Sequence, residues 1–138
     1  MSDKKTESLR RVPLFAPLSK KRLSQLAALM DEVDVAAGRT LIRQGKPGDT
    51  FYLVLDGEVE VQVGAKAGVR LGAGEFFGEI SMLDRGPAVA TVVTQAPSRM
   101  MVMSHAQFRD AMGTDPELHS AVLAAMAHRL REDLDSST

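Results

Sequence analysis

Residues 51–63 have the sequence FYLVLDGEVEVQV, and this stretch sets the pattern for the middle of the chain. Its second half places a valine at every other position from 59 to 63, as on one face of a half-buried β-strand. Its first half, 51–55, is rich in aromatic and aliphatic residues that favour strands. Asp56-Gly57, between the halves, is typical of a two-residue hairpin turn. We therefore expect the two halves to pair as antiparallel strands.

Turn-forming residues recur on both sides of this stretch, from Gly38 to Pro97, with short β-prone runs between them. Strands at such short spacing are typical of an all-β barrel or sandwich. Further strands are expected at 32–35, 40–44, 69–71, 90–94 and 100–103. The sequence thus predicts a mainly β fold, an antiparallel β-barrel or jelly roll, over residues 32–103.

A helical pattern precedes the predicted barrel. Ser19 is a suitable N-cap, and the apolar residues after it recur at intervals of three and four, which places them on one helix face: Leu23, Leu26 and Met30. We expect one N-terminal helical part at 6–31. Basic residues cluster around it, and a solvated helix face explains them better than a nucleic-acid-binding arm: Lys4-Lys5, Arg10-Arg11 and Lys20-Lys21-Arg22.

Two more helices are expected after the barrel, within 104–134. Ser104 and Gln107 have the spacing of a capping box, in which each side chain bonds the backbone N–H of the other residue. Asp115-Pro116 begins the second helix, because Asp is a good cap and proline is favoured at the first helical position. Four apolar residues spaced four apart follow on that helix: Leu118, Val122, Met126 and Leu130. This stripe either packs on the barrel or pairs with a second copy in a homodimer.

Composition limits the class of protein. At 138 residues the chain fits one domain, 1–138. It has no cysteine, which excludes disulfide frameworks, thiolate metal sites and cysteine nucleophiles. The net charge of −1 provides no overall field for nucleic acid, and no apolar run is long enough for a membrane span or a signal peptide. We expect a cytoplasmic protein that does not bind a membrane.

No catalytic motif is found in the sequence. The three histidines, His105, His119 and His128, include no i, i+4 pair that could aim two rings at one metal. We interpret them as ordinary helix-surface residues. Neither a nucleophile elbow nor a phosphate loop of nucleotide hydrolases occurs. The sequence therefore predicts no enzyme activity and no bound metal.

The segment 72–83, GAGEFFGEISML, interrupts the β-pattern. Gly78 would let the backbone turn or approach a ligand closely, and the residues after it could begin one helical turn whose free N–H groups attract phosphate. Glu79 would repel that phosphate, so it suits a hydroxyl donor such as a ribose. The alternative is a bulged barrel corner with Phe76 or Phe77 in the core and Glu79 solvated.

One family resemblance is carried by the motif FGEISML at 77–83, followed by Pro87 and Ala90-Thr91-Val92. This motif resembles the phosphate-binding cassette of cyclic-nucleotide-binding domains, as found in catabolite activator protein and the regulatory subunits of protein kinase A. The resemblance covers about Leu9 to Leu134. It implies a jelly roll of the double-stranded β-helix type with an N-terminal helix and two C-terminal helices. Other landmarks of the family occur in order: Gly38, Ile42, Gly45, Gly48-Asp49, Tyr52, Gly57 and Gly74.

The resemblance also implies roles for individual residues of the segment 77–91, here called the cassette. Backbone N–H groups of a short helix, at Gly78, Ile80 and Ser81, bind the cyclic phosphate, and Glu79 takes the ribose 2′-hydroxyl. The implied ligand is a cyclic nucleotide, and no other cofactor is expected. The expected ligand-binding residues are Phe77, Gly78, Glu79, Ile80, Ser81, Arg85, Ala88, Val89, Ala90 and Thr91.

The family pattern Pro-Arg-x-Ala-Thr/Ser is broken at one position. This chain has Pro87-Ala88-Val89-Ala90-Thr91, so Ala88 replaces the arginine that pairs with the phosphate. A charge-assisted hydrogen bond contributes about 1.5–3 kcal/mol, so its loss weakens binding by roughly ten- to a hundredfold. Arg85 is a candidate substitute, although an exposed pair with Asp84 is the simpler interpretation. Val89 lacks the hydroxyl of some cGMP-preferring members, which favours cAMP over cGMP.

Two function hypotheses follow. The first is a non-catalytic regulatory module that binds cAMP weakly and signals to an unknown protein partner in trans, because no helix-turn-helix for direct DNA binding follows Leu134. The second is an interaction protein that keeps the fold and has lost the nucleotide. Ala88 favours the second hypothesis, whereas Gly78, Glu79 and Ala90-Thr91 favour the first.

Overall fold

The structure is a computed structural model of the chain and describes residues 2–11, 15–16, 18–78, 81 and 86–136. The chain divides into two units. One consists of residues 28–109 and holds the strands. The other joins residues 1–27 to residues 110–138, so segments from the two ends of the sequence build one helical unit.

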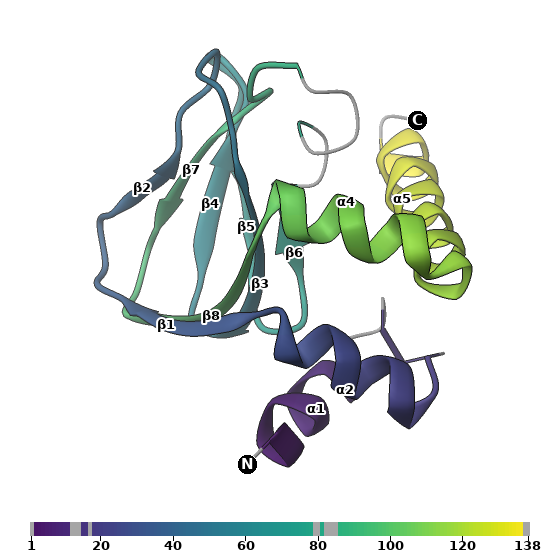
Figure 1. Cartoon of the computed structure of the whole chain (residues 1–138). Coiled ribbons are helices and arrows are strands. Elements are labelled where there is room, and N and C mark those ends of the chain that lie inside the picture. The colour runs from purple at the N-terminus through teal and green to yellow at the C-terminus, as the bar shows by residue number, and fades with distance from the viewer. Residues whose placement is uncertain (1, 12–14, 17, 79–80, 82–85, 137–138) are drawn as a thin grey trace. The chain divides into compact units, whose positions relative to one another are not determined.

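Two four-stranded antiparallel sheets face each other in the described part of unit 28–109 (Figure 1). One sheet has the strand order β1 (Asp31–Val35), β8 (Ser98–Ser104), β3 (Thr50–Asp56) and β6 (Phe76–Phe77). The other has the order β2 (Thr40–Ile42), β7 (Thr91–Thr94), β4 (Val59–Gln62) and β5 (Val69–Leu71). The predicted antiparallel jelly roll is confirmed. Every further strand expected from the sequence is present, and the short strand β6 was not predicted.

Buried apolar side chains fill the space between the two sheets: Val54, Val59, Phe77, Val92 and Met100. Val54 and Met100 are register partners on β3 and β8. Val59 and Val92 come from β4 and β7 of the other sheet. Burying a side chain of this size contributes roughly 1.5–3 kcal/mol. This cluster therefore holds the sheets face to face.

The opposite face of β3 is buried as well, because side chains alternate between the two faces of a strand. Phe51 stacks on Phe108 of α4 (His105–Thr114), with ring centroids 5.2 Å apart. Phe51 also contacts Phe76 of β6, at 5.8 Å between centroids. β3 thus has no face for water, which explains the nearly unbroken apolar run at 51–55.

The predicted pairing of the two halves of 51–63 is wrong. β3 lies in one sheet and β4 in the other, so the chain crosses between sheets at Asp56-Gly57. Gly57 has a φ of +107°, and a Cβ there would lie 2.6 Å from the Cβ of Ser98. Ser98 Oγ accepts the N–H of Glu58 at 3.3 Å. The turn is packed against the start of β8, and burial of apolar side chains on both sheets overrides the local hairpin preference.

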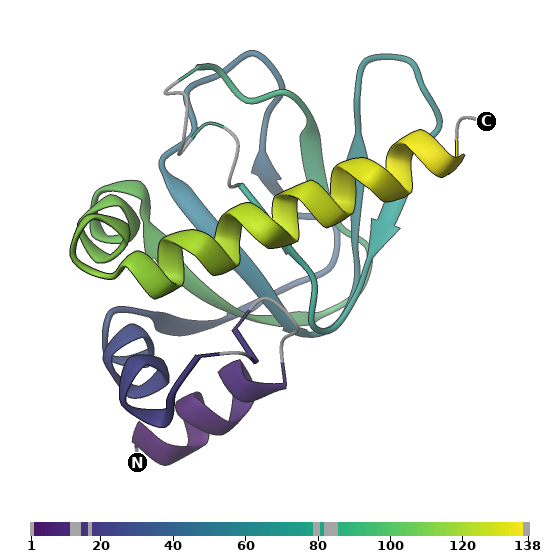
Figure 2. The same cartoon turned by 90° about the vertical axis from the view of Figure 1, so that its right-hand side faces the viewer.

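The helical unit contains α1 (Ser2–Arg10), α2 (Lys20–Ala28) and α5 (Pro116–Ser136), together with the end of α4. α1 lies beside α2 in both views (Figures 1 and 2), and the hydroxyl oxygens of Thr6 and Ser24 are 3.5 Å apart. The sequence predicted one N-terminal helix, whereas the structure has two. The polar composition of α1 conceals its buried residues, Thr6 and Leu9.

The predicted starts of both C-terminal helices are confirmed by their caps. Ser104 Oγ accepts the N–H of Gln107, and Gln107 Oε1 accepts the N–H of Ser104, each at 3.1 Å. Asp115 Oδ1 accepts the N–H of Leu118 at 3.1 Å. These bonds satisfy N–H groups that a helix start leaves without partners, and so they set where α4 and α5 begin.

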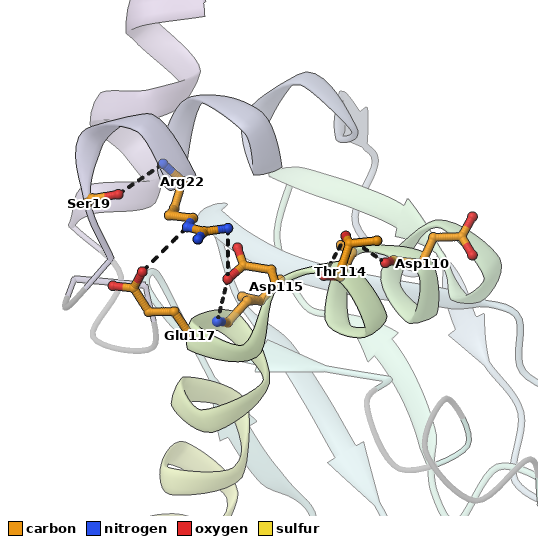
Figure 3. Close-up of polar contacts among 8 residues, drawn as sticks. Ser19, Arg22, Asp110, Thr114, Asp115 and Glu117 are labelled. Carbon is orange, nitrogen blue, oxygen red and sulfur yellow. Dashed lines mark hydrogen bonds and ion pairs between the residues drawn. The ribbon is translucent and has the colours of Figure 1, made fainter.

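Arg22 connects α2 to the start of α5 (Figure 3). Its Nη1 is 3.3 Å from Asp115 Oδ1, and its Nε is 3.5 Å from Glu117 Oε2. Ser19 caps α2 by accepting the N–H of Arg22 at 3.2 Å, as predicted. Arg22 was expected on a solvated helix face. Its guanidinium instead joins the N-terminal and C-terminal parts of the helical unit.

We expect Asp115→Ala to lower the free energy of unfolding by about 1–2 kcal/mol, because it removes an N-cap and a partner of Arg22. Asp115→Asn keeps a side-chain oxygen for the N–H of Leu118 and loses only the charge, so it should cost less, about 0.5 kcal/mol. Urea denaturation followed by circular dichroism measures both variants. Equal losses would show that the ion pair matters and the cap does not.

Candidate functional site

The second half of the cassette is bonded to the loop between β2 and β3. The N–H of Gly45 donates to Ala88 O at 2.8 Å, and the N–H of Ala88 donates to Lys46 O at 2.9 Å. The N–H of Gln44 donates to Thr91 Oγ1 at 3.0 Å. The loop and this part of the cassette therefore hold each other in place.

Ala88 is buried and uncharged, at the position where the family resemblance implies an arginine. It is 7% exposed, as is Ala90, whereas Val89 between them is 48% exposed. Both backbone polar groups of Ala88 are already bonded, to Gly45 and Lys46. A phosphate placed here would meet no positive charge from residue 88.

Gly78 has a backbone conformation and a close neighbour that residues with a Cβ would not tolerate. Its φ is +89°, which side chains disfavour, and a Cβ there would lie 2.5 Å from the backbone oxygen of Thr50. Phe77, just before it, is buried in β6 and stacks on Tyr52 with ring centroids 4.8 Å apart. Phe76 is buried too, so both phenylalanines are in the core. The chain leaves β6 at a fixed point and bends at once, as the sequence predicted for Gly78.

Tyr52 keeps its proton at neutral pH. Burial raises the pKa of its phenol above the ordinary value of 10, and the Asp49 carboxylate raises it further, against a smaller opposing effect of a hydrogen bond with Thr50. The hydroxyl donates to Leu41 O over a long 3.5 Å. Tyr52 therefore packs against Phe77 of the cassette without a charge.

His105 is buried, contrary to the predicted surface position. It is 6% exposed, and its Nε2 lies 3.1 Å from Gly78 O. Its backbone N–H donates to Asp49 O at 2.8 Å. Helical spacing shows which residues share a face, but it cannot show that α4 begins against the cassette. His119 and His128 are exposed on α5, as expected.

A pocket of about 760 Å³ lies among the 45–50 loop, the cassette and the first turns of α4. Ser81 is the one predicted site residue among its described lining residues, and it is 8% exposed. Sequence reasoning missed His105 and Arg109, although their i, i+4 spacing puts them on one face of α4. The polar residues that line the pocket are Asp49, Thr50, Ser81, Ser104, His105 and Arg109.

Glu79, Ile80 and Arg85 lie outside the described residues, so their contacts with ribose and phosphate stay predictions. Among the residues that the structure describes, no group of three or more His, Asp or Glu side chains is placed to hold a metal ion. None of the described helices has the length and apolar character needed to cross a bilayer.

Comparison with known proteins identifies the family. The model of the cyclic nucleotide-binding domain matches residues 32–115. The chain is 28% identical over 130 residues to a CRP-like cAMP-activated global transcriptional regulator of Mycobacterium tuberculosis, a match that covers 91% of this chain and 58% of that protein. The chain spans from about an eighth to about three-fifths of the length of curated relatives that it matches.

Two solved structures share the fold. The N-terminal domain of a transcriptional regulator from Streptomyces coelicolor is 34% identical, with a TM-score of 0.74 and coverage of 95% of both chains. The regulatory subunit of a cAMP-independent protein kinase A from Trypanosoma brucei has a TM-score of 0.82 at 21% identity, over 99% of this chain and 50% of that one. The chain belongs to the cyclic nucleotide-binding domain family, whose domains are regulatory, non-catalytic modules.

We expect Gly78→Ala to lower the free energy of unfolding by about 2–4 kcal/mol, because it combines a positive φ with a clash against backbone that cannot move aside. Gly48→Ala is the matched control. A Cβ at Gly48 would meet Ser81 and His105 at ordinary distances of 3.6–3.8 Å. Thermal and urea denaturation of the two variants compare them directly. A Gly78→Ala protein as stable as Gly48→Ala would contradict the turn described here.

Proposed function

We propose that the chain is a regulatory domain that binds a cyclic nucleotide, with cAMP favoured over cGMP. Its family membership supports this, and the turn at Gly78 is the observation that carries it. A residue without a Cβ lets the backbone approach a phosphate closely, and Gly78 is the glycine that the family resemblance assigns to phosphate binding. The mycobacterial relative is itself cAMP-activated.

In this proposal the backbone carries most of the phosphate contacts. N–H groups of Gly78, Ile80 and Ser81 donate to the cyclic phosphate, in the way that a helix start binds an anion. Glu79 accepts the ribose 2′-hydroxyl, because a carboxylate is an acceptor and suits a hydroxyl donor. Val89 offers no hydroxyl near the base or phosphate, which favours cAMP.

Ala88 makes the proposed binding weak. The absent arginine would have supplied a charge-assisted hydrogen bond, and we expect an affinity roughly ten- to a hundredfold below that of a domain with arginine at this position. Arg85 is the candidate substitute cation in the cassette. The site then depends on the preformed turn for a larger share of its affinity.

The second candidate is an interaction protein that no longer uses a nucleotide. The burial of Ala88, with both backbone groups bonded to the 45–46 loop, favours it, because that position is closed without a ligand. The cAMP-independent relative from Trypanosoma brucei has the same fold, so the fold is compatible with either function. Under both hypotheses the chain acts as one cytoplasmic domain, 1–138, that regulates a protein partner.

The first test is a thermal-shift titration of the purified chain with cAMP, cGMP and AMP, beside the variant Ala88→Arg. A ligand at about 100 times its Kd adds about 2.7 kcal/mol to stability, which raises the Tm by several degrees. We expect wild type to respond to cAMP at high concentration only, and Ala88→Arg to respond at concentrations ten- to a hundredfold lower.

Val69→Arg is the control, since it adds the same charge at an exposed position outside the cassette. It should not reproduce the gain of Ala88→Arg. A response of Ala88→Arg alone would mean that the pocket survives and that the native chain has given up the nucleotide. If neither wild type nor Ala88→Arg responds to cAMP, the binding proposal is overturned in favour of the second candidate.

α5 is the proposed surface for a second copy of the chain. The predicted stripe is divided in the structure, because Leu118 is buried while Leu130 is 60% exposed. Leu123 is 50% exposed and lies seven residues before Leu130, which places both on one helix face. Val122 and Met126 have side chains outside the described set.

We expect sedimentation equilibrium to show a dimer at tens of micromolar that Leu130→Glu converts to a monomer, because a buried charge would oppose the apolar contact. Lys20→Glu, a charge change on exposed α2, is the control and should leave the dimer intact. A wild-type monomer at these concentrations would exclude the homodimer.

A further inference from the structure

His105 occupies an unusual place for the first residue of a helix. Its backbone N–H is bonded to Asp49 O in the 45–50 loop, at 2.8 Å, and its ring is bonded to Gly78 O at the start of the cassette, at 3.1 Å. One residue therefore connects α4 to two segments that lie far from it in sequence. The ring is 6% exposed, so water does not compete freely for these bonds.

The direction of the ring bond follows from the chemistry of its partner. A carbonyl oxygen only accepts hydrogen bonds, so Nε2 of His105 must carry the proton that it shares with Gly78 O. A side chain without an N–H or O–H at this point would leave the carbonyl without this donor.

Gly78 is a residue at which such a contact matters. A glycine reaches backbone conformations that other residues cannot, so contacts with its neighbours restrict it. A Cβ at Gly78 would lie 2.5 Å from the backbone oxygen of Thr50, so the strand β3 approaches it closely. The Gly78 carbonyl is also bonded to the ring of His105.

The ring of His105 lies near Gly48 of the 45–50 loop and near Ser81 of the cassette. A Cβ at Gly48 would be 3.8 Å from Cε1 of His105 and 3.6 Å from Cβ of Ser81. Ser81, itself in the cassette, is 8% exposed and lines the same pocket as His105. The ring thus lies beside the 45–50 loop and the cassette, with its Nε2 on Gly78 O.

We propose that His105 is a positioning residue for nucleotide binding, which holds the Gly78 carbonyl so that the backbone at Gly78 is fixed before the ligand arrives. The inference rests on the proposed function. A preformed turn loses less freedom on binding, and this gain is expected whether residue 88 is alanine or arginine.

The test measures the Kd for cAMP by isothermal titration calorimetry in wild type, His105→Leu and His105→Gln. Leucine fills much of the ring volume and donates no bond, whereas the glutamine amide can donate to the same carbonyl. From the contribution of one hydrogen bond we expect His105→Leu to weaken binding by about three- to tenfold, and His105→Gln to restore it to within about twofold of wild type. His119→Leu, at an exposed position of α5, should change nothing.

The outcomes separate the two proposals. If wild type binds cAMP and His105→Leu binds it equally well, the positioning role is overturned and the proposed function stands. If wild type does not bind but Ala88→Arg does, the same His105 variants are compared in that background, where the same ratios are expected. If neither binds, the proposed function fails.

A measurement on the unmodified protein covers the case in which His105→Leu does not fold. The ¹⁵N spectrum of the histidine rings should show the His105 proton on Nε2, protected from exchange with water. His119, which is exposed, should show a rapidly exchanging ring proton. A His105 ring with its proton on Nδ1 and a bare Nε2 would overturn the positioning role without any substitution.

Discussion

Burial of β3 on both faces is the constraint on which the rest of the structure depends. Toward the second sheet, Val54 packs in a cluster with Val59 and Val92. On the other face, Phe51 stacks on Phe108 of α4. Apolar surface on both sides of one strand can leave water only if a sheet covers one face and further elements cover the other. The face-to-face sheets and the place of α4 both follow from this strand.

The candidate site takes its position from the same strand. β6 pairs with β3 at Tyr52 and Leu53, so the chain leaves β6 beside Thr50 and turns at Gly78. The stacked ring of Phe108 holds the first turns of α4 on that sheet, and this brings His105 to the Gly78 carbonyl. A single glycine is therefore held by a strand and a helix that are about fifty residues apart in the sequence. The backbone at Gly78 is therefore set by the packing of the core.

The sequence predicted the helix starts correctly where the capping bond joins residues that are close in sequence. The capping box at Ser104 and the cap at Asp115 both form as expected, because each involves residues three apart. The predicted hairpin at Asp56-Gly57 is wrong because contacts between distant residues decide the structure there. Its turn preference is small beside the burial of apolar side chains on two facing sheets, so the chain crosses from one sheet to the other.

The sequence by itself determined the antiparallel jelly roll, the helices on either side of it and the family, because strand alternation, caps and the FGEISML motif are all local patterns. It also showed that Ala88 brings no charge to the cassette. Only the tertiary structure decided that β3 and β4 belong to different sheets, that Arg22 joins the two ends of the chain, and that His105 is buried against Gly78. These three features are contacts between residues far apart in sequence. The stability of these contacts depends on which surfaces of the folded chain meet. A local pattern of residues does not contain that information.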